Sequence, residues 1–236
     1  MSAKHILING ASSGIGAVLA KLLAAQGHKL SLCGRSATKL SSVINSLPTS
    51  SLPSGSLVHS ESFCVSDHSR IAQFCQQASE KLNVDVIINC VGINQSRESA
   101  VGVAKDTLDW HMQINCYAPI EFINQLAPSM QSHKAGVILN VLSTVCLFSN
   151  PGIAVYSATK AALDSFTKVM RKELRSDNIK VLSIYPGGVD TDFREAQRPN
   201  YLSAEDVADA IATMLSTSDK AHIHELVIRP AIEDNY

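Results

Sequence analysis

Apolar runs of strand length alternate along the chain with amphipathic stretches of helix length. The runs that we expect to form strands are His5–Ile8, Lys29–Cys33, Leu57–Val65, Val84–Cys90, Gly136–Leu142, Ile179–Ile184 and His224–Ile228. Such alternation is typical of βαβ units, whose crossover helices cover both faces of a parallel sheet. We therefore predict an α/β fold with one doubly wound parallel sheet of about seven strands. A chain of 236 residues suits a single domain over residues 1–236.

The first predicted strand ends in a turn that contains three glycines. In "NGASSGIG" these are Gly10, Gly14 and Gly16, and the stretch from Ile15 to Gln26 predicts a helix that stops at Gly27. A glycine-rich turn at this place presents backbone N–H groups and a helix N-terminus to a pyrophosphate. Alone, the pattern also fits a turn that binds nothing, so a dinucleotide site of the Rossmann type needs support from the rest of the chain.

Composition and charge narrow the classes of partner. The net charge is −1 and no Lys/Arg run occurs, so we expect no nucleic acid partner. The longest apolar stretch, "GVILNVLSTVCLF", is too short to span a bilayer and contains Asn140, so we expect no membrane partner. Because a strand begins near Lys4, we expect no signal peptide and predict a cytoplasmic protein.

The six cysteines are scattered without a CxxC pair, and most lie in apolar segments. This distribution is typical of small buried hydrophobic residues in a reducing compartment. Neither Cys nor His residues cluster at ligand spacing. We therefore predict no metal site.

Five segments, in order along nearly the whole chain, resemble the motifs of the short-chain dehydrogenases/reductases. They are "NGASSGIG", with Asn9 where Thr is usual; "NCVG", which begins at Asn89; "VLSTV", with Ser143; "VYSATK", with Tyr156 and Lys160; and "YPGGVDT", which matches a Pro-Gly-x-Val-x-Thr pattern. The resemblance implies a Rossmann-type sheet. It also implies an oxidoreductase that transfers a hydride between a nicotinamide cofactor and a small carbonyl or alcohol substrate, a ketone or hydroxy acid.

Tyr156 and Lys160 have the spacing that acid–base chemistry requires. Four residues apart on a helix, they lie on one face. A free tyrosine has a pKa of about 10, and a neighbouring ammonium favours the phenolate. Tyr156 is therefore expected to exchange a proton with the substrate oxygen, and Ser143, thirteen residues earlier, to hydrogen-bond that oxygen. The resemblance adds Asn115, in "MQINCYAP", as the residue that positions a water beside Lys160.

The resemblance also implies a set of cofactor contacts. They are Gly10, Ser12, Ser13, Gly14, Ile15, Gly16, Arg35, Val65, Asn89, Val91, Gly92, Tyr156, Lys160, Pro186, Gly187, Val189 and Thr191. At Val65 the contact with adenine is expected through the backbone, because "ESFCVSD" has Cys64 where the family often has Asp.

The choice of cofactor depends on the end of the second strand. A site that prefers NAD needs a carboxylate there, whereas a site that prefers NADP needs a cation. Gly34 stands where the acid would be and Arg35 follows, with Lys39 one turn further as a helper. We predict NADP(H). The alternative is that Arg35 is a solvated residue before a helix capped by Ser36.

The substrate is defined mainly by the segment after Thr191. Only "DFREAQRPNYL" precedes the next helix, which favours a small substrate. Arg194 and Arg198 either meet a substrate carboxylate or are solvated charges. The terminal "HIHELVIRP" resembles the NADP-dependent 3-hydroxy acid dehydrogenase-like subgroup. His111 and His133 are interpreted as surface residues.

Two other functions stay open at this point. They are reduction of 3-oxoacyl thioesters and an NADP-binding sensor or scaffold without turnover, and the complete Asn115, Ser143, Tyr156 and Lys160 set argues against the second. An epimerase of the longer related family would need Gly-x-x-Gly-x-x-Gly and a larger C-terminal region, which this chain lacks. We also expect a homodimer or homotetramer, formed through the helices that bear Asn115 and Tyr156.

Overall fold

A computed structural model describes residues 3–48, 55–193 and 198–234. It contains one parallel sheet of seven strands in the order β3-β2-β1-β4-β5-β6-β7. The strands are β1 (His5–Asn9), β2 (Lys29–Gly34), β3 (Leu57–Ser62), β4 (Val86–Asn89), β5 (Gly136–Val141), β6 (Ile179–Pro186) and β7 (Glu225–Ile228). The predicted α/β fold with a doubly wound, Rossmann-type parallel sheet is confirmed.

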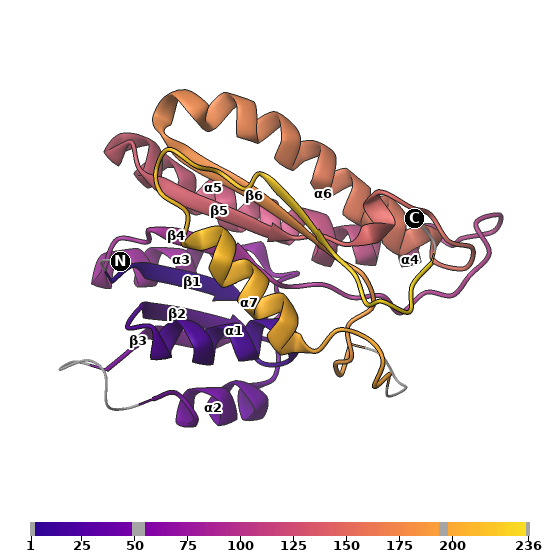
Figure 1. The fold of residues 1–236 in the computed structure, drawn as a ribbon, viewed down its shortest axis with the longest axis horizontal. Coiled ribbons are helices and arrows are strands. Elements are labelled where there is room, and N and C mark those ends of the chain that lie inside the picture. Colours follow the sequence, from indigo (N-terminus) through magenta and orange to yellow (C-terminus); the bar gives the residue numbers. More distant parts are fainter. Residues whose placement is uncertain (1–2, 49–54, 194–197, 235–236) are drawn as a thin grey trace.

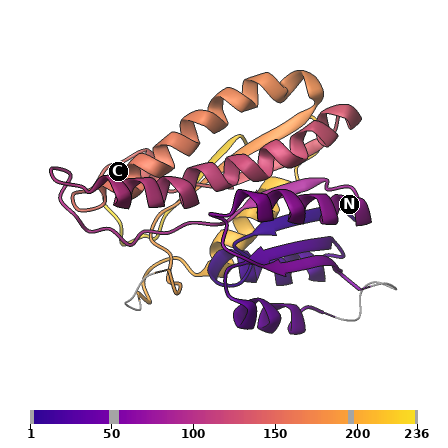
Figure 2. The same ribbon diagram turned by 180° about the vertical axis from the view of Figure 1, so that it is seen from behind.

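Helices cover both faces of the sheet (Figures 1 and 2). One face carries α1 (Gly14–Ala25), α2 (Ala37–Asn45) and α7 (Ala204–Leu215), and the other carries α3 (His68–Lys81), α5 (Ala118–His133) and α6 (Ala154–Glu173). The remaining helical elements are the α-helix α4 (Lys105–Met112), the π-helix η1 (Gln113–Tyr117), and the 3₁₀ turns η2 (Thr144–Cys146) and η3 (Leu174–Asp177). Among the helices of the described ranges, none has the length and apolarity required to cross a membrane.

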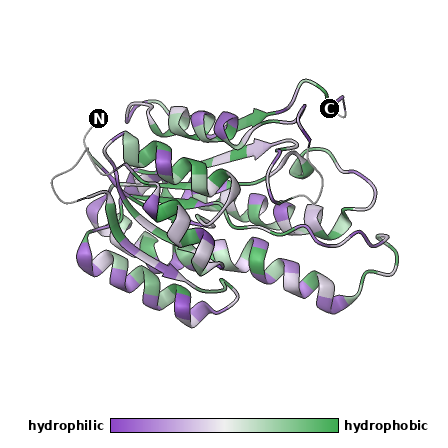
Figure 3. Cartoon of the chain, turned by 90° about the horizontal axis from the view of Figure 1, so that it is seen from below, coloured by the Kyte–Doolittle hydropathy of each residue, from purple (hydrophilic) through white to green (hydrophobic). Residues whose placement is uncertain are grey.

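The alternation of β1 explains why both faces need a cover. Ile6 and Ile8 belong to the core beneath α1 and α7, whereas Leu7 belongs to the core beneath α3 and α5. Successive side chains of a strand point to opposite faces, so an apolar run such as "ILI" needs helices on both sides. Figure 3 shows the result, with green strands between helices that are purple on their outer faces.

The ends of some strands differ from the prediction. β3 stops at Ser62, whereas the apolar pattern extended it to Val65. Beyond β3 the carbonyl of Cys64 accepts a hydrogen bond from the N–H of Asp67 at 3.0 Å, and the Asp67 side chain caps α3 by accepting from the N–H of Arg70 at 3.2 Å. This turn ends the pairing, because apolar character alone does not report where backbone groups find other partners.

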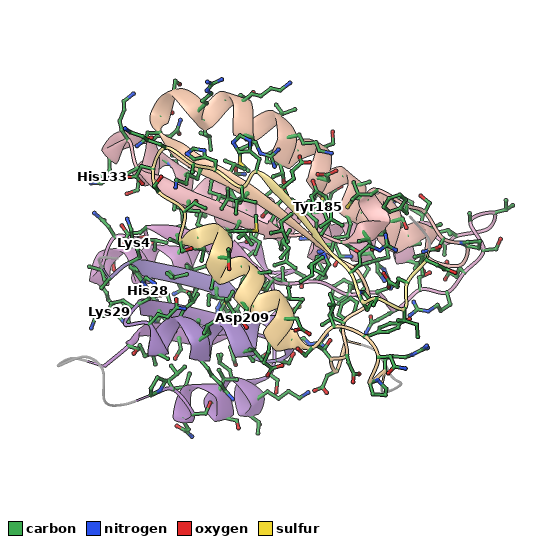
Figure 4. The ribbon with its side chains drawn as sticks, viewed as in Figure 1. Lys4, His28, Lys29, His133, Tyr185 and Asp209 are labelled. Carbon is green, nitrogen blue, oxygen red and sulfur yellow. The ribbon has the colours of Figure 1, made fainter. Side chains whose placement is uncertain are left out.

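All the predicted functional segments lie at one edge of the sheet. Because the seven strands are parallel, the turns that follow β1, β4, β5 and β6 meet at their carboxyl ends. β1 and β4 are neighbours, and the chain leaves them toward opposite faces, which opens a crevice between them. In Figure 4, Tyr185 of β6 lies toward this edge, whereas Lys4, His28, Lys29 and His133 lie at the opposite edge.

Candidate active site

The glycine-rich turn packs against the exit of β4. Gly10 has a φ of +71°, and a Cβ atom there would lie 2.9 Å from the backbone nitrogen of Val91. A Cβ at Gly16 would collide with the carbonyl oxygen of Gly10. Glycine is required at Gly10 both for its left-handed backbone and for this close approach. The turn therefore packs against β4 by direct approach of the two backbones.

The N-terminus of α1 opens into a cleft of about 460 Å³. Ser13 is the N-cap residue, and its hydroxyl makes no capping hydrogen bond to the helix. Thr191 approaches from the segment after β6, and its Cβ would be 3.5 Å from a Cβ at Gly14. A helix N-terminus with an uncommitted hydroxyl and glycine backbone suits a phosphate group. The α1 end of the cleft thus suits a phosphate group, whereas Asp190, Asp192 and Glu205 line its other side.

Buried asparagines on three neighbouring strands hold the strand ends together. Asn9 donates to Asn89 Oδ1, Asn89 Nδ2 donates to Asn140 Oδ1 at 2.7 Å, and Asn140 Nδ2 donates to Thr167 Oγ1 of α6 at 2.8 Å. Asn9 Oδ1 also accepts from the backbone N–H of Val91 at 3.1 Å. The amide of Asn9 thus donates to one neighbour and accepts from another. The Thr that is usual here also has both functions, but its side chain is shorter. The Asn89 side chain is committed to the sheet, so its predicted cofactor contact rests on its backbone.

Lys160, Asn115 and Gly92 meet at the carboxyl end of β4. A Cβ at Gly92 would lie 3.5 Å from Lys160 Nζ and 3.6 Å from Asn115 Oδ1. Asn115 Oδ1 accepts from the N–H of Ile93 at 2.7 Å, and its Nδ2 donates to Thr159 Oγ1 of α6 at 3.0 Å. Asn115 lies in η1, and π-helical turns inside helices are frequent at functional sites. The amide therefore ties the turn after β4 to α6.

Lys160 is almost completely buried, and only 4% of the residue is exposed. Its Nζ donates to the carbonyl of Val141 at 2.8 Å. Burial lowers the pKa of Lys160 from 10.5 to about 8, because the ammonium loses its hydration. Near neutral pH the ammonium is thus retained at a cost to the fold. Strongly perturbed ionisable groups of this kind are concentrated in functional sites.

The pH dependence of stability should report this cost. Between pH 8 and 10.5 the unfolded chain binds the Lys160 proton and the folded chain releases it, so stability rises with pH across this range. A pKa lowered from 10.5 to about 8 corresponds to about 3 kcal/mol. We expect urea unfolding to show the parent gaining up to this amount over a Lys160→Met variant from pH 8 to 10.5. Stability curves that run parallel with pH would contradict the lowered pKa.

Tyr156 and Ser143 are placed near Lys160 by α6 and by the turn after β5. Tyr156 lies in the first turn of α6, one turn before Lys160. Ser143 is the N-cap of η2, and its Oγ accepts from the N–H of Val145 at 3.3 Å. The Tyr156 ring faces Phe193, with the ring centroids 6.0 Å apart. The predicted catalytic side chains therefore come from adjacent segments of the same edge.

The predicted cofactor residues are distributed along this edge. The turn after β1 and the start of α1 contain Gly10, Ser12, Ser13, Gly14, Ile15 and Gly16. Each of the next strands is followed by further members of the set: Arg35 after β2, Val65 after β3, and Val91 and Gly92 after β4. The end of β6 and the segment beyond it contain Pro186, Gly187, Val189 and Thr191. Val65 is 7% exposed and packs in the core with Val91. The contact of the Val65 backbone with adenine stays a prediction.

The end of β2 shows how the candidate selectivity residues are placed. Arg35 is exposed just before α2, and the Ser36 side chain caps that helix by accepting from the N–H of Lys39 at 3.3 Å. Lys39 Nζ forms an ion pair with Asp192 at 2.7 Å, so the predicted helper already has a partner. A Cβ at Gly34 would lie only 2.7 Å from Ser12 Cβ. An aspartate at Gly34 therefore requires the glycine-rich turn to shift.

Comparison with known proteins identifies the family. The model of the family described as short chain dehydrogenase matches residues 4–202. An oxidoreductase of Staphylococcus aureus, described as uncharacterized, is 30% identical over 230 residues, which is 96% of this chain and 97% of its own. The chain belongs to the short-chain dehydrogenase family.

Solved structures of other proteins share the fold of this short-chain dehydrogenase. An alcohol dehydrogenase from the archaeon Thermococcus sibiricus, complexed with 5-hydroxy-NADP, superposes with a TM-score of 0.89 at 22% identity and 99% coverage of both chains. Serine dehydrogenase from Escherichia coli has a TM-score of 0.85 at 23% identity, covering 98% of this chain and 99% of its own. A metagenomic short-chain oxidoreductase in complex with NADP has a TM-score of 0.85 at 25% identity, with the same coverage.

Within this short-chain dehydrogenase, one histidine is not where the sequence suggested. His111 was predicted at the surface but is 2% exposed. Its Nδ1 bonds the carbonyl of Thr107 at 2.8 Å, and its Nε2 accepts from the N–H of Gln95 at 3.2 Å. It anchors the long segment after β4 to α4, which a helical pattern cannot reveal. His133, the last residue of α5, is exposed as predicted.

Of the two arginines that could bind a substrate carboxylate, the structure describes one. Arg198 stacks over the ring of Tyr201, with Cζ 5.6 Å from the ring centroid, and its N–H bonds Asp190 at 2.9 Å. Arg194 lies outside the described residues. Arg198 therefore supports the loop through Tyr201 and Asp190.

Two features of this short-chain dehydrogenase were missed from the sequence. Phe193 lies against Tyr156, and Glu233 near the C-terminus bonds the N–H of Gly188 at 2.8 Å. The doubled glycine in "YPGGVDT" is the one signal that points to the second contact, because a second glycine exceeds what the Pro-Gly-x-Val-x-Thr pattern asks for. No periodicity connects Phe193 with Tyr156.

Proposed function

We propose that this short-chain dehydrogenase transfers a hydride between NADP(H) and a small carbonyl or alcohol substrate. The observation that supports the proposal most is the buried Lys160, one helical turn after Tyr156, at the sheet edge that carries the glycine-rich turn. A buried ammonium is costly, and a functional role for it at this place would explain why the cost is retained.

The residues around the cleft fit a dinucleotide cofactor. The N-terminus of α1 and the Ser13 hydroxyl suit the pyrophosphate, and Arg35 at the end of β2 suits a 2′-phosphate. Lys160 would contact the nicotinamide ribose, and the Pro186–Thr191 segment would hold the nicotinamide, as the family resemblance implies. NADPH, when bound, supplies the hydride.

The chain's own residues would donate and accept the proton. In reduction the new C–H bond forms at the carbonyl carbon, the electron pair of the C=O bond moves to oxygen, and that oxygen takes the hydroxyl proton of Tyr156. Lys160 stabilises the resulting phenolate, and Ser143 donates a hydrogen bond to the same substrate oxygen. Asn115 Oδ1 accepts a hydrogen bond from the N–H of Ile93 and has a second lone pair for a water beside Lys160. In oxidation the same groups act in reverse.

The surroundings of Tyr156 favour a small substrate. The Phe193 ring lies beside the Tyr156 ring in a tilted arrangement, and few residues separate Thr191 from α7. A small ketone or hydroxy acid suits this space better than a long acyl chain. The likeness to serine dehydrogenase in fold is consistent with the 3-hydroxy acid dehydrogenase-like subgroup.

A panel of ketones, 3-oxoacyl thioesters and hydroxy acids, followed at 340 nm with NADP(H) and NAD(H), tests the proposal. We expect turnover of at least one small ketone or hydroxy acid with NADP(H). Turnover confined to long 3-oxoacyl thioesters would favour the thioester reductase instead. Tight NADPH binding with no turnover of any member would contradict the proposed activity and favour a sensor.

We further propose that the protein acts in the cytoplasm as a homodimer or homotetramer. Large apolar side chains are exposed on α4, η1 and α6, namely Trp110 (40%), Tyr117 (46%), Phe166 (39%) and Val169 (54%). Exposed apolar groups gathered on neighbouring elements are typical of an interface. We expect light scattering at micromolar concentration to give the mass of two or four chains, and Val169→Glu to lower that mass. A parent that is monomeric would contradict this assembly.

A further inference from the structure

The C-terminal residues 229–233, which we call the strap, lie against the loop that follows β6. The carbonyl of Ile228 accepts from the N–H of Gly187 at 2.8 Å, which continues the pairing of β6 and β7. Glu233 then turns back, its N–H donating to the carbonyl of Pro230 at 3.1 Å. Its Oε1 accepts from the N–H of Gly188 at 2.8 Å. In Figure 1 this yellow segment runs toward the end of the sheet where the β5–α6 connection lies.

The strap also reaches the loop that follows β5. Arg229 pairs with Glu233 at 3.2 Å, and the two side chains are 12% and 19% exposed. The Arg229 guanidinium lies 5.2 Å from the centre of the Phe148 ring. Phe148 follows Ser143 by five residues in the same loop. One carboxylate therefore connects the loop after β6, directly, with the loop that carries Ser143, through Arg229.

The loop after β6 is shaped to receive the strap. A Cβ at Gly187 would collide with the Glu233 carboxylate and would lie 3.0 Å from Pro230 Cδ. A Cβ at Gly188 would collide with the ring of Tyr201 and would lie 3.0 Å from Glu233 Oε1. Neither glycine has a positive φ, so contact rather than backbone conformation accounts for them. The two glycines of "YPGGVDT" are matched to Glu233 on one side and Tyr201 on the other.

We propose that Glu233 is a positioning residue for hydride transfer. It fixes the loop from Pro186 to Thr191 relative to the loop that carries Ser143, and so sets the distance between nicotinamide and substrate. This inference rests on the proposed function, because these loops matter for turnover only if they hold cofactor and substrate. A misplacement of about 1 Å at such a site costs up to about 100-fold in rate.

The strap is well placed for this role because the Glu233 carboxylate is little exposed, accepts a hydrogen bond from the Gly188 N–H and forms an ion pair with the Arg229 guanidinium. Removing it leaves the Gly188 N–H without its acceptor and removes the ion pair with Arg229, so the two loops lose this connection. The Gly188 N–H bond requires an acceptor and the Arg229 pair requires a negative charge. Glu233→Gln retains an acceptor but not the charge, so it separates the two contributions.

The experiment compares Glu233→Ala and Glu233→Gln with Asp234→Ala, an exposed carboxylate next in the chain. The readouts are kcat, KM for NADPH, Tm, and hydrogen exchange of the peptide that contains Gly188. We expect Glu233→Ala to lower kcat by about 100-fold and Glu233→Gln by about 10-fold. Asp234→Ala should stay within twofold of the parent. Exchange at Gly188 should become faster in Glu233→Ala and stay closer to the parent in Glu233→Gln, which retains the acceptor, with Tm within a few degrees of the parent.

The outcomes distinguish failure of this inference from failure of the proposed function. A kcat within twofold of the parent in both Glu233 variants would overturn it, as would a loss that merely follows a lowered Tm. Exchange at Gly188 that is unchanged in Glu233→Ala would overturn it even in a protein without turnover. If the parent turns over no substrate of the panel, the proposed function fails, and the exchange data still decide whether Glu233 fixes the loop.

Discussion

Replacement of Tyr156 by phenylalanine is expected to lower kcat by at least ~10²-fold while NADPH binds nearly as before. The ring and its contact with Phe193 are retained, and only the transferable proton is lost. Positioned acid–base groups contribute about 10²- to 10⁴-fold to a rate. The measurement is kcat by NADPH absorbance together with NADPH affinity by fluorescence titration.

Tyr117→Phe is the matched control, because Tyr117 is 46% exposed on η1. It should leave kcat unchanged. Activity of Tyr156→Phe within tenfold of the parent would remove Tyr156 from the mechanism. A loss of NADPH binding in step with kcat would instead make its role one of cofactor binding.

Arg35→Ala is expected to lower the preference for NADPH over NADH by about 10- to 100-fold. A guanidinium can bind a 2′-phosphate through two charge-assisted hydrogen bonds, each worth about 1.5–3 kcal/mol before screening. Arg35 is exposed, and no ion pair among the described residues occupies it. The ratio of kcat/KM for the two cofactors is the measurement, and kcat/KM for NADH should hardly change.

Lys39→Ala separates the two cations at this end of the cofactor site. Because Lys39 is already paired with Asp192, its loss should change the cofactor ratio less than the loss of Arg35. Equal values of kcat/KM for NADPH and NADH in the parent would show that Arg35 does not confer selectivity.

The sequence alone suggests that Gly34→Asp with Arg35→Ala would reverse the preference, and the structure changes that expectation. A Cβ at Gly34 would lie 2.7 Å from Ser12 Oγ and 3.1 Å from the Ser12 backbone nitrogen. The aspartate would therefore displace the glycine-rich turn that is to hold the pyrophosphate. Adding Ser12→Gly relieves the side-chain part of this conflict, so the triple variant should bind NADH better than the double variant.

Periodicity carries the prediction of the fold because it reports burial. The apolar run "HILIN" identifies a strand covered on both faces, and β1 has that character. The end of β3 and the burial of His111 could not be predicted, because periodicity does not report individual hydrogen bonds. Both depend on individual hydrogen bonds, those of Cys64 with Asp67 and of His111 with Gln95.

The site divides in the same way. Residues that recur at fixed spacing, such as Tyr156 and Lys160, could be named from the sequence, and the parallel strands bring their segments to one edge. The contacts of Glu233 with Gly188, and of Gly34 with Ser12, join segments distant in sequence. These contacts depend on interatomic distances in the folded chain, which a sequence pattern does not contain.

Transfer of a labelled hydride tests the central claim most directly. NADPH carrying deuterium at one or the other position of nicotinamide C4 is incubated, in two parallel reactions, with the parent and a ketone that it reduces. The account predicts that one of the two labelled cofactors delivers its deuterium to the carbinol carbon of the product, and that Tyr156→Phe suppresses this transfer. Consumption of NADPH without deuterium in the product from either cofactor would contradict it.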